Sequence, residues 1–242
     1  MNPRVTLATA GRVLRQLRHD HRTLALMLVV PCVLISLLAW VFDGTPTFDR
    51  IGAPLLGVFP FVVMFLVTSV ATLRERTTGT LERLLTMPIG KLDLLAGYAL
   101  AFGLVAVVQA LAATTLSVTL LDLDVAGPGW LLLVVAVLDA VLGMALGLLV
   151  SAFAATEFQA VQFLPALVLP QFLLCGLLVP RDQLDTALNW VSDVLPLSYA
   201  VDAMSAISAS PDPDVLVELS VVAVAIALAL GVGAATLRRR TP

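Results

Sequence analysis

The chain has 242 residues and a formal net charge of −3; 60% of the residues are hydrophobic, 13% are charged, and the mean hydropathy is +1.01. This composition excludes an ordinary soluble domain and indicates an integral membrane protein. Both cysteines, Cys32 and Cys175, lie in apolar runs, and both histidines lie before the first apolar run. The sequence therefore predicts no disulfide, no metal site and no histidine-based catalytic centre within the membrane.

Residues 4–22 are predicted to form a basic amphipathic helix. Apolar residues recur at helical spacing on one side, from Leu7 through Ala10 and Leu14 to Leu17, while arginines lie on the other. We expect this helix to lie in the plane of the membrane interface, with its arginines toward anionic head groups. The alternative is a disordered basic tail. The candidate interface residues are Arg12, Arg15 and Arg18.

Six apolar runs follow, and each is long enough to cross a hydrocarbon core of about 30 Å. We therefore expect an all-α integral membrane protein with six transmembrane helices in a single domain, residues 1–242. The fourth run contains a small-xxx-small pair, Gly143 and Gly147, which permits close approach of another helix. The predicted spans are residues 24–42, 51–73, 92–120, 130–153, 160–179 and 215–237.

The distribution of Lys and Arg predicts the orientation of these spans. The N-terminal segment, the segment between the second and third spans, and the C-terminus hold 12 of the 14 basic residues. Arg50 and Arg181, the other two, fall in segments on the opposite side. Because cytoplasmic segments carry the excess of Lys and Arg, we expect a multi-pass plasma-membrane protein with both termini in the cytoplasm.

Residues 74–89 form the most polar stretch between the first apolar run and the C-terminus. After Gly79, leucines at positions 81, 84 and 85 share one helix face, and Glu82 suits the positive end of the helix dipole. Pro88 ends the helix, because the residue before a proline disfavours helical angles. The pattern predicts a short amphipathic helix of about two turns that docks a protein outside the membrane. The alternative is a charged loop that obeys the positive-inside rule.

Residues 180–214 are too polar to span the membrane and too apolar for a free loop, since aspartates alternate with large apolar residues. Leu184, Leu188 and Val191 recur at helical spacing. We expect one or two short helices that dip into the outer leaflet where they are buried against protein. The alternative is an outer amphipathic helix that lies flat.

Asp139 is the one acid placed deep within a predicted span. Because an ionisable residue at that depth is costly and usually faces a bundle interior or a water path, Asp139 is a candidate functional residue. The alternatives are a structural hydrogen bond to a neighbouring helix or a position near the outer interface. Gln109, Gln162 and Gln171 are polar points in other spans and are candidates to share a cavity with Asp139 on a substrate path.

The sequence lacks the motifs of nucleotide hydrolysis and of covalent catalysis. Residues 89–91 lack the upstream glycine and the Ser or Thr of a phosphate-binding loop, and no HExxH, CxxC or GxSxG motif occurs. We therefore expect a chain that is not itself an enzyme and binds no cofactor. If the chain takes part in an energy-driven process such as transport, the energy would come from a reaction in a partner protein.

Two separated motifs resemble those of a known family of membrane proteins. Residues 75–88 match the pattern E-R-x-x-G-T-L-E-x-L-L-x-T-P nearly throughout, with Met87 where threonine is frequent. Residues 175–184 and 195–200 form the second match, with Cys175 where a small Ser or Gly is common. In both motifs the chain resembles the permease subunits of type-2 ABC exporters, and most closely those of the daunorubicin-resistance branch.

The resemblance implies a type-2 ABC exporter fold, in which two identical or homologous permease copies pair with two copies of a separate ATP-binding subunit that holds ATP and Mg. Residues 79–88 would be the coupling helix that docks on the ATPase, residues 4–22 the connecting helix, and residues 180–208 the outer re-entrant hairpin. The substrate path would run between the permeases, lined by the first, second and fifth spans. The residues implied in ATPase coupling are Glu75, Arg76, Gly79, Thr80, Leu81, Glu82, Leu84, Leu85 and Pro88, and those implied in the hairpin are Pro180, Arg181, Pro196 and Tyr199.

The implied function is outward transport of a hydrophobic or amphipathic compound, such as a drug or antibiotic. A permease for a lipid or a lipid-linked glycan has the same architecture, but aromatic residues make up only 6% of the chain, which favours the drug. A proton-coupled secondary transporter with Asp139 as its relay should have inverted repeats, and none is visible. An intramembrane enzyme would need catalytic motifs, and a scaffold would not need a docking helix. We expect the partners to be the ATPase, a second permease and membrane lipids, and no nucleic acid.

Overall fold

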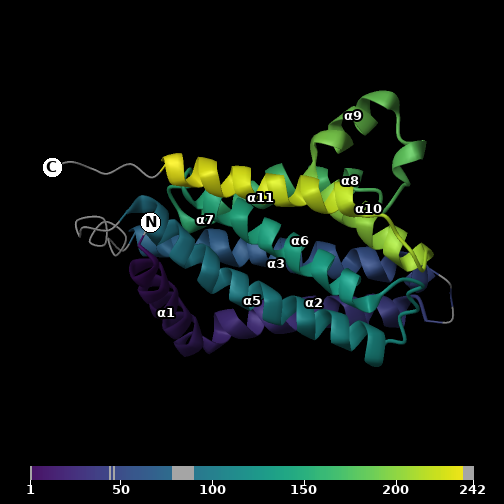
Figure 1. Cartoon of the computed structure of the whole chain (residues 1–242), viewed down its shortest axis with the longest axis horizontal. Helices are drawn as coiled ribbons and strands as arrows, with labels where there is room; N and C mark the ends of the chain where they lie inside the picture. Colours follow the sequence, from purple (N-terminus) through teal and green to yellow (C-terminus); the bar gives the residue numbers. More distant parts are fainter. Residues whose placement is uncertain (1, 44, 46, 78–89, 237–242) are drawn as a thin grey trace.

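The computed structural model describes residues 2–43, 45, 47–77 and 90–236, and the regular elements of that part are all helices (Figure 1). Six of its helical segments are long and apolar enough to cross a membrane. This confirms the predicted all-α class with six spans. The spans are α2 (His21–Val41), α3 (Thr47–Thr77), α5 (Lys91–Thr119), α6 (Gly129–Ser151), the run of α7 (Glu157–Phe163), η1 (Leu164–Val168) and α8 (Leu169–Leu174), and α11 (Leu216–Thr236).

The spans lie along the long axis of the molecule, and the two ends of the bundle differ (Figure 1). One end carries the N-terminal helix, the end of α3, the start of α5 and the end of α11. The other end carries the connections from α2 to α3, from α5 to α6 and into α11. We call these the inner and the outer end, following the orientation that the basic residues predict. The orientation itself stays a prediction.

Helices α3 and α6 form the centre of the bundle and are its most buried spans. Gly143 and Gly147 let the two backbones touch. A Cβ at Gly147 would lie 2.6 Å from the carbonyl oxygen of Phe65, and a Cβ at Gly143 would collide with the carbonyl oxygen of Phe61. Only glycine fits at so close an approach, so this pair has the packing role that the sequence predicts.

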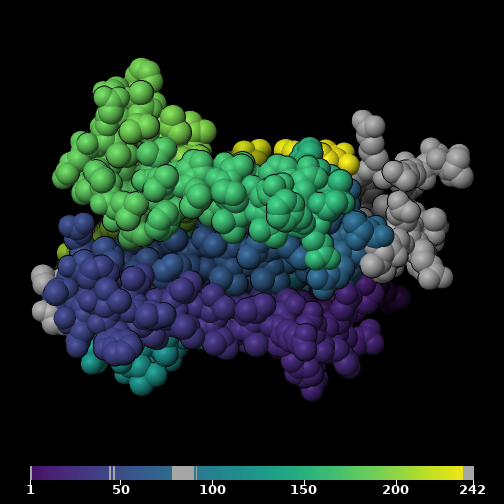
Figure 2. Space-filling model, turned by 180° about the vertical axis from the view of Figure 1, so that it is seen from behind, coloured from purple at the N-terminus to yellow at the C-terminus, as the bar shows by residue number. Residues whose placement is uncertain are grey.

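Helix α2 and the run from α7 to α8 flank α3 on one face of the bundle (Figure 2). Both are mostly exposed in the part of the chain that the structure describes. They display large apolar side chains, such as Leu26 and Val29 on α2 and Phe158 and Leu173 on α7 and α8. In a bilayer, a surface of this kind faces lipid chains or another subunit.

Several predicted span boundaries differ from the helix ends, such as the start of the second span, which is predicted at residue 51 although α3 begins at Thr47. Two other differences have a clear cause. The predicted second span ends at residue 73, whereas α3 continues to Thr77, because the charges of its last turn find partners on neighbouring helices. The predicted fifth span reaches residue 179, whereas α8 ends at Leu174. Gly176 adopts a φ of +91° there, which takes the chain out of the helical path and which glycine tolerates best.

The predicted basic helix corresponds to α1 (Pro3–His19), which crosses the inner end of the bundle (Figure 1). Its buried face differs in part from the predicted one: Leu7 is 65% exposed, whereas Thr6, Thr9 and Val13 are buried. The reason is close packing, because α1 approaches α5 where small side chains are needed. A Cβ at Gly97 of α5 would lie 2.5 Å from the Cβ of Thr9.

The predicted outer segment folds as a 3-10 turn, η2 (Arg181–Gln183), and two helices, α9 (Thr186–Val194) and α10 (Pro196–Ala209). Helix α10 packs into the bundle, and its Met204 and Ile207 are completely buried. Helix α9 projects sideways from the bundle (Figure 1) and leaves Trp190 70% exposed. The expectation of burial against protein therefore fits α10 and is wrong for α9 within this chain.

Candidate functional site

Three consecutive charged residues, Arg74, Glu75 and Arg76, form the last turn of α3 at the inner end. Successive residues of an α-helix point about 100° apart, so the three side chains reach different neighbours. Arg74 makes a two-bond ion pair with Glu157 at the start of α7, with N–O distances of 2.9 and 3.1 Å. The Arg76 guanidinium donates to the carbonyl oxygen of Ser151 at the end of α6. This turn therefore connects α3 to both α6 and α7.

Glu75 is buried and forms a cluster with Arg12 of α1 and Tyr98 of α5, which we call the inner cluster. The Nη2 atom of Arg12 lies 2.9 Å from Oε2 of Glu75 and 2.8 Å from the Tyr98 oxygen. The Tyr98 hydroxyl donates to the same carboxylate oxygen, and the guanidinium lies 5.6 Å from the centroid of the Tyr98 ring. A buried carboxylate needs a cation and donors to offset its lost hydration, and here both come from other helices.

The packing of α1 explains why Arg12 meets Glu75. Thr9 lies against Gly97 of α5, as described above. Arg12 follows Thr9 by three residues and so lies on the same side of α1. The expectation that Arg12 faces lipid head groups is therefore wrong, because a buried carboxylate on α3 pairs with it. Arg15 and Arg18, the other predicted interface residues, are exposed on α1.

Asp20 forms the corner between α1 and α2. Its carboxylate accepts hydrogen bonds from the backbone N–H of Thr23 at 3.1 Å and from the Thr23 hydroxyl at 2.6 Å, which caps the start of α2. The bond from the hydroxyl lowers the pKa of Asp20. The corner is therefore held by a short local motif, whereas the rest of α1 is held by contacts to distant helices.

A cavity of about 310 Å³ lies beside the inner cluster, between α1, α2, α3, α5 and α7, and we call it the inner cavity. Leu66, Val67 and Phe102 belong to its apolar walls, while Asp20 and Glu75 lie at the inner end of its helices. This volume is at the lower limit for small-molecule sites, which also combine apolar walls with a few polar groups. The cavity can hold the apolar part of a small molecule with a polar group toward the inner end.

The predicted coupling residues fall into two groups. Glu75 and Arg76 lie in the last turn of α3 and make the contacts described above. The others lie outside the described residues: Gly79, Thr80, Leu81, Glu82, Leu84, Leu85 and Pro88.

The predicted substrate-path residues lie in different surroundings. Asp139 and Gln109 are completely buried in α6 and α5, and neither side chain has a hydrogen-bond partner among the residues that the structure describes. Gln171 is buried too, but its Oε1 accepts from the backbone N–H of Leu197 at 3.4 Å, which links α8 to α10. Gln162 is exposed on α7. The structure does not gather these four side chains around one cavity, and a transport role for Asp139 stays a prediction.

Sequence reasoning missed Tyr98, Glu157 and Ser151, which complete the contacts at the inner end. Tyr98 is one of two tyrosines in the chain, and a phenol inside an apolar run signals a buried hydrogen bond. Glu157 is the one acid in the link between the fourth and fifth spans, which the predicted orientation puts at the same end as Arg74. The bond to Ser151 uses a backbone carbonyl and has no signal in the sequence.

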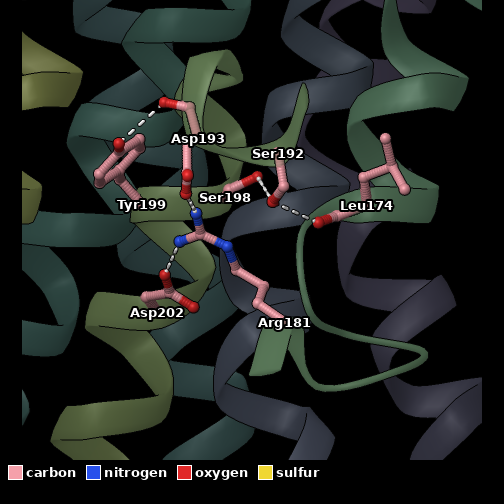
Figure 3. Close-up of polar contacts among 7 residues, drawn as sticks. All are labelled: Leu174, Arg181, Ser192, Asp193, Ser198, Tyr199 and Asp202. Carbon is pink, nitrogen blue, oxygen red and sulfur yellow. Dashed lines mark hydrogen bonds and ion pairs between the residues drawn. The ribbon is translucent and has the colours of Figure 1, made fainter. Parts of the chain in front are cut away.

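At the outer end, Arg181 is held between two acids in what we call the outer cluster (Figure 3). Its Nη atoms donate to Asp202 of α10 and Asp193 of α9, and its guanidinium lies 5.4 Å from the centroid of the Tyr199 ring. The Tyr199 hydroxyl donates to the carbonyl oxygen of Asp193 at 2.8 Å. Burial raises the pKa of Asp202, although Arg181 opposes the shift.

Of the predicted hairpin residues, Arg181 and Tyr199 meet in the outer cluster. Ser192 adds a second link, since its hydroxyl donates to the carbonyl oxygen of Leu174 at 2.8 Å and lies 3.0 Å from the Ser198 hydroxyl (Figure 3). Pro180 precedes η2 and Pro196 begins α10, positions at which the missing N–H of proline is tolerated. These contacts fix α9 and α10 to the end of α8.

Comparison with known proteins gives concordant results. A family model described as "ABC-2 type transporter" matches residues 4–208. The chain is 25% identical over 159 residues to "ABC transporter G family member 20" of Dictyostelium discoideum, a match that covers 66% of this chain and 22% of that protein. It is 26% identical over 147 residues to "Probable multidrug ABC transporter permease YbhS" of Escherichia coli (strain K12), covering 60% of this chain and 39% of that protein.

Each match spans less than half the length of the curated relative. The family model, in contrast, runs from the start of α1 to the end of α10 and so includes the inner cluster, the inner cavity and the outer cluster. Since this match covers most of the chain, the protein belongs to the ABC-2 type transporter family.

Proposed function

We propose that this chain is the membrane-spanning permease subunit of an ATP-driven exporter of the daunorubicin-resistance type. A separate ATP-binding subunit would hold ATP and Mg, and the permease would move a hydrophobic or amphipathic compound, such as a drug or antibiotic, outward across the plasma membrane. The family match, the six spans and the motif at residues 75–88 support this proposal. The name of the Escherichia coli relative, a probable multidrug permease, supports the substrate class.

The inner cluster is the observation that carries the proposal. It joins α1, α3 and α5 at one carboxylate, and α3 and α5 are the helices that residues 79–88 connect along the chain. A protein that docks on residues 79–88 would therefore act on three helices together. The close contact between α3 and α6 at Gly143 and Gly147 would pass the movement to the centre of the bundle.

The inner cavity fits the entry point of the transported compound. Its walls come in part from α2, α3 and α7, which belong to the first, second and fifth spans. Transport would require the compound to bind the inward-open and outward-open states with different affinities. A ligand that binds both states equally does not change the equilibrium between them. Closure of the ATP-binding subunits would supply the energy for that exchange.

A second permease copy, identical or homologous, would complete the transporter. The exposed apolar face of α2 and α7–α8 (Figure 2) is the surface that we assign to it, with the substrate path between the copies. Both termini and residues 79–88 would lie in the cytoplasm, as the positive-inside rule requires.

The proposal is tested by affinity purification of the tagged permease in mild detergent, followed by an assay of ATP hydrolysis. We expect an ATP-binding subunit to co-purify with the wild type. Glu82→Lys should reduce its recovery at least tenfold, because it reverses the charge of the predicted docking helix. Asp124→Lys, a matched reversal in the loop between α5 and α6, should leave recovery unchanged. Equal recovery and equal ATP hydrolysis for both variants would contradict the assignment.

A further inference from the structure

A second cavity, of about 410 Å³, lies at the outer end of the bundle, and we call it the outer cavity. The start of α3, residues 176–182 and α10 surround it. Its lining combines apolar groups, such as Ile51 and Leu177, with four charged side chains. Arg50 and Arg181, the two basic residues of the predicted outer side, both belong to it.

The four charges of the outer cavity divide into a bonded pair and a pair without a bond between them. Arg181 and Asp202 bond to each other, as described for the outer cluster. Arg50 and Asp182 are both exposed, and neither side chain makes an ion pair or a hydrogen bond with any residue that the structure describes. The cavity therefore offers one uncommitted cation and one uncommitted anion.

Arg181, which also lines the outer cavity, is held by several contacts. The stem of Arg181 packs on Gly176, where its Cγ lies 3.2 Å from the position of an added Cβ. The head of Arg181 is fixed by two carboxylates and by the Tyr199 ring (Figure 3). A preformed wall of this kind lowers the entropy cost of binding, which is how small-molecule sites are usually built.

The arrangement of charge selects the class of ligand. An anionic ligand would be attracted by Arg50 but repelled by Asp182. A cationic ligand would be attracted by Asp182 but repelled by Arg50. A zwitterion satisfies both. Arginine binds phosphate oxygens through its planar fork of donors, and a carboxylate suits an ammonium group. The apolar lining favours a molecule that also carries an acyl chain.

We propose that the outer cavity binds a zwitterionic amphiphile with a phosphoethanolamine headgroup, with its phosphate at Arg50 and its ammonium at Asp182. The site would hold a lipid of the outer leaflet at the base of the hairpin. This inference does not rest on the proposed transport function, since a lipid can occupy the site whether or not an ATP-binding subunit is present.

The test uses the delipidated full-length chain in detergent and measures the rise of Tm with added ligand. The probes are dihexanoyl phosphatidylethanolamine, dihexanoyl phosphatidylglycerol, free phosphoethanolamine and inorganic phosphate. We expect saturable stabilisation by the phosphatidylethanolamine, at a half-saturating concentration about tenfold below that of the phosphatidylglycerol. Arg50→Gln and Asp182→Asn should each raise the half-saturating concentration about tenfold.

Arg22→Gln is the matched control, because it removes an exposed charge at the inner end. It should leave the half-saturating concentration unchanged. Equal affinity for the two lipids, equal effects of Arg50→Gln and Arg22→Gln, or no shift with any probe would overturn the proposal. If free phosphoethanolamine or inorganic phosphate saturated at the same concentration as the lipid, the site would be a site for small ions and the amphiphile assignment would be wrong.

Discussion

The inner and outer clusters use the same chemistry, an arginine placed over a tyrosine ring and paired with carboxylates, but they connect different parts of the chain. In the inner cluster, Arg12 bonds residues that are 63 and 86 positions away, on two other helices. In the outer cluster, Arg181 bonds acids only 12 and 21 positions away, within one hairpin. One cluster ties the ends of separate helices together, and the other fixes a local fold.

Burial separates the two clusters as well. The Glu75 side chain is 9% exposed, whereas those of Asp193 and Asp202 are 50% and 38% exposed. Solvent screening weakens the attraction within an ion pair as exposure rises, and a buried charge that loses its partner is costly. Removal of one partner should therefore cost more stability in the inner pair than in the outer pairs. A buried pair that spans three helices suits transmission of movement, and this is the role that we give the inner cluster.

The largest effect should come from Glu75→Leu, which removes the centre of the inner cluster. The change leaves Arg12 facing the protein without its carboxylate, and breaking a buried pair in this way costs about 3 kcal/mol. Thermal unfolding in detergent should show the loss. Glu75→Gln keeps the shape and one acceptor and should cost less. A Glu75→Leu protein as stable as the wild type would mean that the inner cluster does not hold the three helices.

A smaller and more local effect is expected for Asp202→Ala in the outer cluster. Arg181 keeps Asp193 as a partner, so the loss of stability should be about 1 kcal/mol. Hydrogen exchange should rise between residues 175 and 209 and stay unchanged in α1 and in the last turn of α3. Faster exchange at the inner end as well would show that the two clusters are coupled, which contradicts the local role.

The ion pair of Arg74 and Glu157 separates the effect of burial from the effect of sequence distance. Like the inner pair it joins residues far apart in the chain, but it is exposed. Its side chains are 57% and 47% exposed. A double-mutant cycle with Arg74→Gln and Glu157→Gln should give a coupling energy of about 0.5 kcal/mol that falls with added salt. The same cycle with Arg12→Gln and Glu75→Gln should give a clearly larger value. Equal values would mean that burial does not distinguish the pairs.

The smallest expected effects are changes of stability with pH. Their signs are opposite for Asp20 at the inner end of the bundle and Asp202 at the outer end. Asp20 has a lowered pKa, so the stability it contributes is present above its ordinary pKa of 3.8 and is lost as the pH falls through the lowered folded value. Asp202 has a raised pKa, so the folded state binds a proton more readily than the unfolded chain. Its contribution therefore grows as the pH falls through the raised folded value.

Measurements of Tm from pH 7 to about pH 2 on Asp20→Asn and Asp202→Asn test these signs, because the loss expected from Asp20 lies below its ordinary pKa. Relative to the wild type, the first variant should lose less stability on acidification and the second should gain less. The same trend in both variants would contradict the environments described for the two carboxylates.

Hydropathy alone identifies the architecture, because an uninterrupted apolar run has one stable arrangement in a bilayer. The boundaries need more than hydropathy. The predicted second span ends at the first charge, whereas α3 continues to Thr77, since Arg74 and Arg76 bond to residues about 80 positions away that no local pattern can name. The end of α8 depends on one positive φ at Gly176, which looks like any other glycine in the sequence.

The candidate site could be predicted in part. The amphipathic pattern names Arg12, and the resemblance to the permease family names Glu75, Arg181 and Tyr199. Their partners follow only from the packing. The face of α1 shows why: hydropathy favours Leu7, whereas close contact with Gly97 requires a small residue such as Thr9. Periodicity identifies a helix with two faces, and the shape of the neighbouring helix decides which face is buried.

The central claim is that the inner cluster transmits the action of an ATP-binding subunit to the bundle. The direct measurement is ATP-dependent uptake of a hydrophobic fluorescent dye by inverted membrane vesicles that contain the permease and its co-purifying subunit. Arg12→Gln should leave recovery of that subunit unchanged and lower uptake at least tenfold, whereas Arg15→Gln, on the exposed side of α1, should change neither. Uptake that survives Arg12→Gln at the wild-type rate would contradict the account.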